Sequence, residues 1–314
     1  MKSNKLLKNK LPSLLFSIAR LIFLIAFSYI ILYPLLYVIV HAFQAPIDYN
    51  DVTVQWIPKN YTLENLKEGL KATDFFNGLK NTVFVQVACA LIQVATCGIA
   101  AYGRSRFKFK GQGIAIAILF LNILVPTTML IIPNYINFYN VDFLGIMGLI
   151  ESFTGMDLTP NLLNTSWVFF LPSIFGVGLQ SGLLIYIFMQ FFKSFPKELE
   201  EASWIDGLTP FGSFLKIVVP SSGVVILTVT IFSVVWHWNE YYLPSMYLSA
   251  NYPLAVTMYD VFNIIALANF NITTPEVINR AMAALLIFIV PMLVMFLILQ
   301  KKFIRSIAQS GIVG

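Results

Sequence analysis

Residues 201–220 read EASWIDGLTPFGSFLKIVVP, a polar and charged stretch that lies between two long apolar runs. Acidic residues at its start complement the positive end of a helix. That helix is expected to stop at Gly207, because glycine takes a positive φ at little cost. Thr209 followed by Pro210 signals the start of a second helix, and Pro220 is expected to end it. The stretch therefore predicts a helix, a glycine turn and a second helix.

The residue types and spacings of this stretch resemble the EAA loop of bacterial ABC importer permeases. Glu-Ala-Ser at the start is followed by a glycine, an isoleucine and a proline at the family's spacings, with Ser203 and Val219 as mild departures from the usual alanine and leucine. The resemblance implies that the loop docks in a cleft of a cytoplasmic ATPase subunit and couples transport to ATP hydrolysis. The residues that it assigns to coupling are Glu201, Ala202, Ser203, Asp206, Gly207, Ile217 and Pro220.

Other segments resemble the maltose-type, carbohydrate-importing branch of these permeases. They are AYGRSRFKFKG at 101–111, Asn81-Thr82 before an apolar run, Trp238-Asn239-Glu240 with Pro244 behind it, and the glycine-flanked tail 311–314. The resemblance implies the type I ABC importer permease fold. It also implies a second permease subunit, two ATPase subunits that hold ATP and Mg²⁺, and an extracellular solute-binding protein that delivers a sugar. The tail 309–314 is a further candidate for contact with the ATPase.

Composition independently predicts an all-α integral membrane protein. Hydrophobic residues make up 58% of the 314 residues and charged residues only 11%, against roughly 25% charged in an average soluble domain. Uncharged runs of about twenty residues span a bilayer core, and six such runs are expected to be transmembrane helices. They cover residues 21–40, 83–101, 114–133, 167–192, 222–236 with an amphipathic extension to 248, and 282–299.

Prolines inside these runs predict where the helices bend, because proline removes a backbone hydrogen bond. Pro34, Pro126, Pro172 and Pro291 occupy such positions. Bent helices suit a cavity that opens to alternate sides of a membrane, although they also occur in static bundles. Leucines and phenylalanines between residues 63 and 79 predict an amphipathic helix at the outer membrane surface.

The distribution of lysine and arginine predicts the orientation. Most of the 20 basic residues lie before the first run, between the second and third, in the EAA-like loop, or after the last run. Basic residues are retained on the cytoplasmic side, so both termini and the loop are expected in the cytoplasm. The resemblance to the importer permeases implies that the membrane is the bacterial plasma membrane. The expected organisation is a cytoplasmic segment 1–20, a six-span domain 21–300 with the coupling loop at 194–220, and a cytoplasmic tail 301–314. This bias accounts for the net charge of +5, so nucleic acid is not expected as a partner.

Motifs for enzyme chemistry are missing from the sequence. It contains no phosphate-binding loop of the Walker type and no HExxH motif. Cys89 and Cys97 lie two turns apart on one predicted helix and cannot pair, so they are expected to pack in the core. The subunit is therefore expected to have no catalytic residues, metal or cofactor of its own, with ATP hydrolysis in a partner.

Polar side chains within the apolar runs are the candidates for the solute pathway, because burying them in hydrocarbon is costly. Glu240 is the leading candidate, because the aromatic rings beside it could stack on the faces of a sugar while its carboxylate and a neighbouring amide bind the sugar hydroxyls. The alternative is an aromatic belt at the lipid interface, in which Asn239 and Glu240 only hold helices together. The pathway candidates are Asn122, Gln180, Trp236, Trp238, Asn239, Glu240 and Tyr241.

Three other functions stay open. An ABC importer for a different solute, such as a glycerol phosphate ester, would favour a basic cavity, and no Lys or Arg lies centrally in any run. An ion-coupled secondary transporter would need buried carboxylates and usually inverted repeats. A membrane enzyme would need a reactive site.

Overall fold

The computed structural model describes residues 2–310 except 50, 52, 55, 143–144, 156–158 and 269–270, with side chains described between residues 16 and 300. Within these ranges the chain is helical and forms no strand, apart from an isolated bridge between Gln44 and Tyr61. The all-α prediction is therefore confirmed. The chain divides into two compact units, residues 1–73 with 261–289 and residues 74–260 with 290–314.

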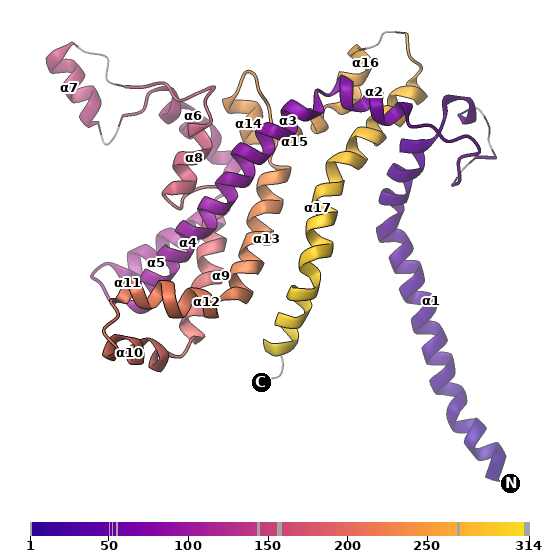
Figure 1. Ribbon diagram of the computed structural model, residues 1–314, viewed down its shortest axis with the longest axis horizontal. Coiled ribbons are helices and arrows are strands. Elements are labelled where there is room, and N and C mark those ends of the chain that lie inside the picture. Colours follow the sequence, from indigo (N-terminus) through magenta and orange to yellow (C-terminus); the bar gives the residue numbers. More distant parts are fainter. Residues whose placement is uncertain are drawn as a thin grey trace. The chain divides into compact units, whose positions relative to one another are not determined.

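The first unit is held together by polar contacts at one end of its long helices. The Asn65 side-chain amide donates to the backbone carbonyls of Ala42 (3.3 Å) and Gln44 (2.8 Å), and Asn279 donates to the Gln44 carbonyl at 3.1 Å. A Cβ added at Gly69 would lie 2.7 Å from the backbone oxygen of Arg280. Glycine at this position therefore permits the helix Glu64–Ala72 to approach the helix Thr274–Ser310 closely. The elements are α1 (Lys2–Phe43), a 3₁₀ turn (Pro46–Asp48), α2 (Glu64–Ala72), α16 (Val261–Ala268) and the first part of α17 (Thr274–Ser310) (Figure 1).

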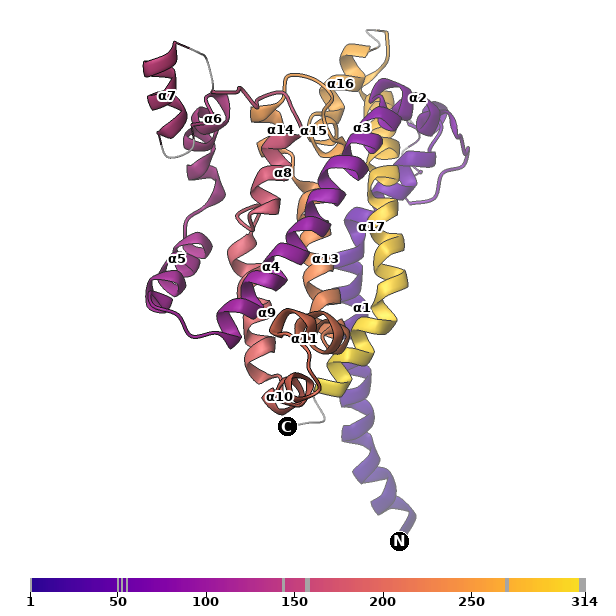
Figure 2. The same ribbon diagram turned by 60° about the vertical axis from the view of Figure 1, so that its left-hand side comes forward.

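The second unit is a bundle around α4 (Ala88–Arg106), which packs against α8, α9 and α13. The turn with α10 and α11 lies at one end of this bundle, and α14 and α15 lie at the other (Figure 2). The remaining elements are α3 (Phe75–Asn81), a π-helical turn (Thr82–Val87), α5 (Gln112–Leu124), a 3₁₀ turn (Thr127–Leu130), α6 (Ile131–Tyr139), α7 (Ile146–Thr154), α8 (Trp167–Ile174), α9 (Ser181–Ser194), α10 (Lys197–Ile205), α11 (Pro210–Ser213), a second π-helical turn (Phe214–Val218), α12 (Val219–Ser221), α13 (Gly223–Asn239), α14 (Tyr242–Tyr247) and α15 (Leu254–Tyr259).

The core of this bundle is built from aromatic and aliphatic side chains of α4, α9 and α13. Cys97 is buried here with Leu184, Phe188, Phe192 and Val229. Cys89 is also buried, and both cysteines are free. The prediction that they pack in the core without pairing is confirmed.

Helices long and apolar enough to cross a membrane confirm part of the span prediction. Among the described residues, Phe16–Phe43, Phe75–Arg106 and Thr274–Gln300 meet that criterion as continuous helices. Two bent pairs raise the number to at most five: Gln112–Leu124 with Thr127–Tyr139, bent by 101°, and Pro210–Ser221 with Gly223–Asn239, bent by 81°. The first bend lies at Pro126, where the sequence predicts one.

The predicted span 167–192 is divided between two helices, and the sequence predicts a bend within it at Pro172. Helix α8 ends at Ile174 and α9 begins only at Ser181, and the connection contains Gly176 and Gln180, both with positive φ (67° and 55°). Pro172 lies two residues before the end of α8. The Pro172 carbonyl accepts from the Val177 amide at 2.8 Å, which closes a turn.

The predicted amphipathic helix 63–79 is also interrupted. Asp74, with φ of 44°, separates α2 from α3. Left-handed backbone ends a helix, and aspartate tolerates it better than most residues. Two short helices therefore replace the single one expected.

Candidate functional site

The segment that resembles an EAA loop has the predicted helix, turn and helix. Helix α10 ends at Ile205, and Gly207 follows with φ of 86°. The Leu208 amide donates to the Ser203 carbonyl (3.0 Å) across this turn. Thr209 caps α11 by accepting from the Gly212 amide at 3.1 Å. A Cβ at position 207 would meet nothing within 4 Å, so the backbone angle, and not space, favours glycine there.

The second helix of the loop extends beyond the expected end at Pro220. A π-helical turn leads into α12, which ends at Ser221. The bend to α13 then falls at Ser222, whose hydroxyl donates to the Val218 carbonyl at 2.6 Å. Pro220 therefore lies in the last turn of this helix.

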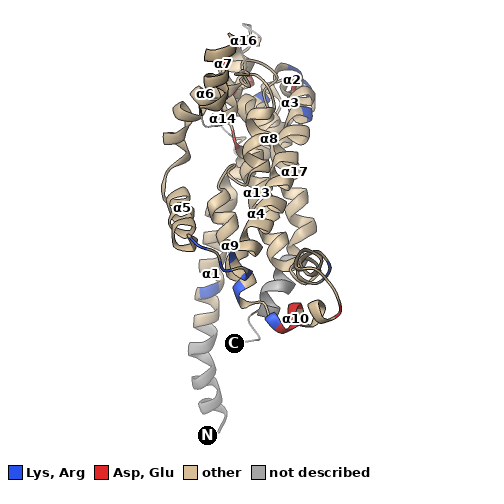
Figure 3. Cartoon of the chain, turned by 90° about the vertical axis from the view of Figure 1, so that its left-hand side faces the viewer, with Lys and Arg blue, Asp and Glu red and all other residues tan. Residues whose placement is uncertain are grey.

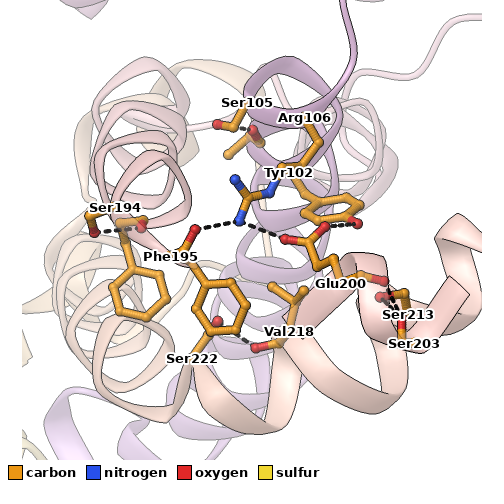
Figure 4. A network of polar contacts seen from close by, with 12 residues as sticks. Tyr102, Ser105, Arg106, Ser194, Phe195, Glu200, Ser203, Ser213, Val218 and Ser222 are labelled. Atoms are coloured by element: carbon orange, nitrogen blue, oxygen red, sulfur yellow. Dashed lines mark hydrogen bonds and ion pairs between the residues drawn. The ribbon is translucent and has the colours of Figure 1, made fainter. Parts of the chain in front are cut away.

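The loop is anchored to α4 through Glu200, a residue that sequence reasoning did not single out for coupling (Figure 4). Its carboxylate lies 2.6 Å from Nη2 of Arg106 and accepts from the Tyr102 hydroxyl at 2.7 Å. Arg106 also donates to the Phe195 carbonyl at 2.9 Å. Glu200 is only 2% exposed. A buried charge persists when it is paired and hydrogen-bonded in this way.

Two serines join the helices of the loop to each other. Ser203 Oγ lies 2.7 Å from the Glu200 carbonyl oxygen and 2.7 Å from Ser213 Oγ. One hydroxyl proton on each serine satisfies both contacts, with Ser203 donating to the carbonyl and accepting from Ser213. Both serines are buried. Serine in place of the alanine more usual in the EAA pattern therefore gives α10 a polar link to α11.

The opposite face of the loop is exposed. Ile205 is 87% exposed and Phe211 59%, and Trp204 is also exposed. Charged groups gather around α10 and the connection between α4 and α5, whereas the middle of this bundle carries few (Figure 3). Of the predicted coupling residues, Glu201, Ala202, Asp206, Gly207 and Pro220 are exposed, Ile217 is half-buried and Ser203 is buried.

A cavity of about 100 Å³ lies elsewhere in the same unit. It is lined by both polar and apolar side chains, and is named the polar cavity for its amides, hydroxyls and carboxylate. Three of the predicted pathway residues line it together: Asn122 from α5, Gln180 from the break before α9, and Glu240 from the end of α13. His237, close to Glu240 in sequence, also lines the cavity. The sequence analysis missed further polar side chains on its wall, because they come from helices and turns distant in sequence. These are Gln86, Thr127, Asn134, Ser173 and Tyr247.

The break between α8 and α9 forms part of this wall and is held by side chains of neighbouring helices. Gln93 donates to the Leu179 carbonyl (2.6 Å) and to Ser181 Oγ (2.7 Å). Thr96 donates to a carbonyl of α8 at 2.8 Å, and the Asn122 oxygen accepts from the Gly182 amide at 2.9 Å. Non-helical backbone at membrane depth is tolerated where protein buries it or where it lines a water-filled cavity. Here Val177, Gly178, Leu179 and Gln180 of the break line the cavity.

The other predicted pathway residues do not line the cavity. Trp236 stacks on Phe232 with ring centroids 5.6 Å apart and packs against the core. Tyr241 stacks on Tyr259 at 4.1 Å. Trp238 is buried, and Asn239 is exposed and donates to a carbonyl of its own helix. These aromatic rings therefore do not form a common sugar-stacking surface in this unit.

Glu240 also has a structural role. Its Oε1 accepts from the backbone amides of Tyr242 (3.0 Å) and Leu243 (2.9 Å), which caps the start of α14. One oxygen of the Glu240 carboxylate is thus bonded to backbone amides. This agrees with the alternative that Glu240 holds helices together. The same residue still lies on the cavity wall.

Broken apolar helices around a polar cavity, with an anchored helical turn at one end of their bundle, are features of a transporter's membrane subunit. Residues 94–309 match the family described as the binding-protein-dependent transport system inner membrane component. The chain belongs to this family.

Relatives and a solved structure extend the similarity over nearly the whole chain. The probable starch degradation products transport system permease protein AmyC of Thermoanaerobacterium thermosulfurigenes is 25% identical over 89% of this chain and 90% of its own length. The sn-glycerol-3-phosphate transport system permease protein UgpE of Shigella flexneri is 24% identical over 81% and 82%. The fold is similar to that of a chain in the crystal structure of a bacterial ABC transporter that imports the acidic polysaccharide alginate, with a TM-score of 0.69 at 19% identity, covering 92% of this chain and 96% of that one.

Proposed function

We propose that the chain is one of two membrane subunits of an ABC importer that carries a neutral sugar or oligosaccharide across the bacterial cytoplasmic membrane. The chain crosses the membrane six times, with α8 and α9 together forming the fourth crossing, and both termini lie in the cytoplasm. Two ATPase subunits, a second permease and an extracellular solute-binding protein complete the transporter. Residues 301–310 form the last part of α17, and the proposal puts them on the ATPase side. The side chains from residue 301 on, and all of 311–314, lie outside the described residues.

The coupling loop is the observation that carries this proposal. Glu200 fastens its inner face to α4 at 2.6 Å from Arg106, while the outer face exposes acidic groups and large apolar side chains such as Ile205. An exposed apolar patch with a polar rim is typical of a protein interface. An element that is rigidly attached to the membrane helices can transmit the closure of two ATPase subunits as a rigid-body movement. Within this subunit no covalent chemistry is required.

The chemistry of the polar cavity supports a neutral polyhydroxylated cargo. Amides, hydroxyls and the Glu240 carboxylate line it beside apolar side chains such as Val168 and Phe169, and no lysine or arginine is among the lining residues. Sugar hydroxyls both donate and accept, which suits amides and carboxylates. A phosphate ester would instead require cationic or helix-terminal partners. The relative named for glycerol 3-phosphate keeps that cargo as the second candidate, but the carboxylate in this cavity weighs against it.

Reconstitution with the partner subunits tests the proposal. The complete transporter in proteoliposomes should take up maltodextrins or arabino-oligosaccharides only when ATP and the solute-binding protein are both present. Preferential uptake of sn-glycerol 3-phosphate would overturn the carbohydrate assignment. Uptake driven by a proton or sodium gradient without ATP would overturn the importer itself.

A further inference from the structure

A second cavity, of about 380 Å³, lies between α4, α5 and α9. Its wall is mostly aliphatic and aromatic, with Ile116, Leu119, Ile185 and Phe109 among the lining residues. Ile118 also lines it and is 60% exposed, so the cavity opens at the surface of the unit. It shares Asn122 and Val177 with the polar cavity but has fewer polar lining residues.

Arg104 lies on the wall of this cavity, near the end of α4. Its Nε is buried without a hydrogen-bond partner, and in the described part of the chain no side chain forms an ion pair with its guanidinium. Arg106, one half-turn further along, is by contrast neutralised by Glu200. A partly buried cation without a counter-charge is unfavourable. An anion from outside the chain would remove that cost.

We infer that this cavity binds one anionic phospholipid, with an acyl chain along the apolar wall and the phosphate on Arg104. Guanidinium pairs with phosphate through two parallel hydrogen bonds. Basic pockets between membrane helices on the cytoplasmic side are typical sites for anionic head groups, and the basic residues predict that this end of α4 is cytoplasmic. Lys108 and Lys110, both exposed in the same connection, attract anionic lipid to the surface around the opening.

The apolar wall favours a lipid over a free anion or a helix of the second permease. Inorganic phosphate would occupy only the Arg104 end and leave the aliphatic wall empty. A packed apolar helix would cover the wall and leave Arg104 without a counter-charge. A phospholipid satisfies both parts of the site with one molecule.

Gly103 allows the acyl-chain part of the site to be tested separately from the charge. A Cβ added at this position meets nothing within 4 Å, and its φ is ordinary for a helix, so Gly103→Leu can be accommodated without a backbone clash and fills part of the cavity. Arg104→Ala removes the head-group contact. Lys216→Ala removes an exposed positive charge of the loop and serves as the control for net charge.

Binding of phosphatidylglycerol and phosphatidylcholine to the full chain, purified in detergent, is measured by native mass spectrometry. Wild type and Lys216→Ala are expected to retain one phosphatidylglycerol in preference to phosphatidylcholine. Both Arg104→Ala and Gly103→Leu should weaken its binding about five-fold or more. Circular dichroism and melting of each variant establish that the chain is folded.

Three outcomes would overturn the inference. Equal retention of the two lipids would remove the role of the anionic head group. Unchanged phosphatidylglycerol binding in both Arg104→Ala and Gly103→Leu would place the lipid elsewhere. Complete displacement of the lipid by millimolar inorganic phosphate, in wild type and Gly103→Leu alike, would show an anion site without an acyl-chain site. None of these results bears on whether the transporter carries sugar.

Discussion

The carboxylate of Glu200 lies 2.6 Å from the guanidinium of Arg106, and both side chains are almost completely buried. This ion pair joins the first helix of the coupling loop to the end of α4, far away in the sequence. Because Tyr102 donates to the same carboxylate, the pair belongs to a hydrogen-bonded network. It fixes the orientation of the exposed face of the loop.

Breaking this pair should destabilise the protein strongly. Removing one member of a buried ion pair leaves the other charge unpaired and costs about 3–5 kcal/mol. We expect Glu200→Ala and Arg106→Ala each to lower the denaturation midpoint measured by scanning fluorimetry. Glu201→Ala removes a carboxylate from the next residue, which is exposed, and should stay within about 0.5 kcal/mol of wild type. Equal losses at 200 and 201 would refute the anchoring role.

The turn at Gly207 should be sensitive to a single methyl group. Gly207→Ala must adopt a φ near 86° and should cost about 1 kcal/mol or more. The matched control is Gly113→Ala, because a Cβ there also meets nothing within 4 Å but the backbone is helical with ordinary φ; it should be neutral or stabilising. Sugar uptake per ATP hydrolysed should fall only in the Gly207 variant, and normal coupling there would argue against a role for this turn.

Orientation can be tested by labelling with a membrane-impermeant thiol reagent in intact cells. Single cysteines at Ser152 and Thr273 should react, and cysteines at Lys108 and Lys197 should react only after the cells are opened. All four positions are exposed. Cys89 and Cys97 are buried, so the unsubstituted chain provides the unlabelled background. The reverse pattern would place the coupling loop outside the cell and contradict the proposed transporter.

The polar cavity should affect transport without affecting the fold. Glu240→Gln keeps an oxygen that can accept from the amides of α14 while it removes the charge from the cavity wall. We expect unchanged thermal stability and a several-fold lower sugar uptake, measured per assembled transporter. A normal rate in this variant would assign Glu240 to helix capping alone.

Trp238 provides the contrasting case. It is 3% exposed and does not line the cavity, so Trp238→Ala should cost about 3–5 kcal/mol of stability through a lost core side chain. The amount of folded protein, measured by fluorescence-detected chromatography, should fall. The uptake rate per assembled transporter should stay normal, and a reduced rate would return this residue to the solute pathway.

Local sequence information determined much of this protein. Hydropathy predicted the helical membrane character, because a bilayer requires long uncharged runs whose backbone is satisfied internally. The turn at Gly207 was also predicted from the sequence, since the positive φ of Gly207 and the cap at Thr209 depend only on neighbouring residues. Its resemblance to the EAA loop then indicated the family.

Tertiary packing decided what lies inside and what lies outside. Glu200 and Glu201 are chemically identical neighbours, yet only the contact with Arg106 on a distant helix buries the first. The break between α8 and α9 is stabilised by Gln93 and Asn122 from other helices. The apolar run therefore predicted only a bend at Pro172 and not an open connection between two helices. The aromatic residues beside Glu240 also pack against different neighbours, with Trp236 on Phe232 and Tyr241 on Tyr259. Their common sequence neighbourhood therefore did not predict a common surface. Burial and hydrogen-bond partners between distant segments are properties of the folded chain, and no local pattern encodes them.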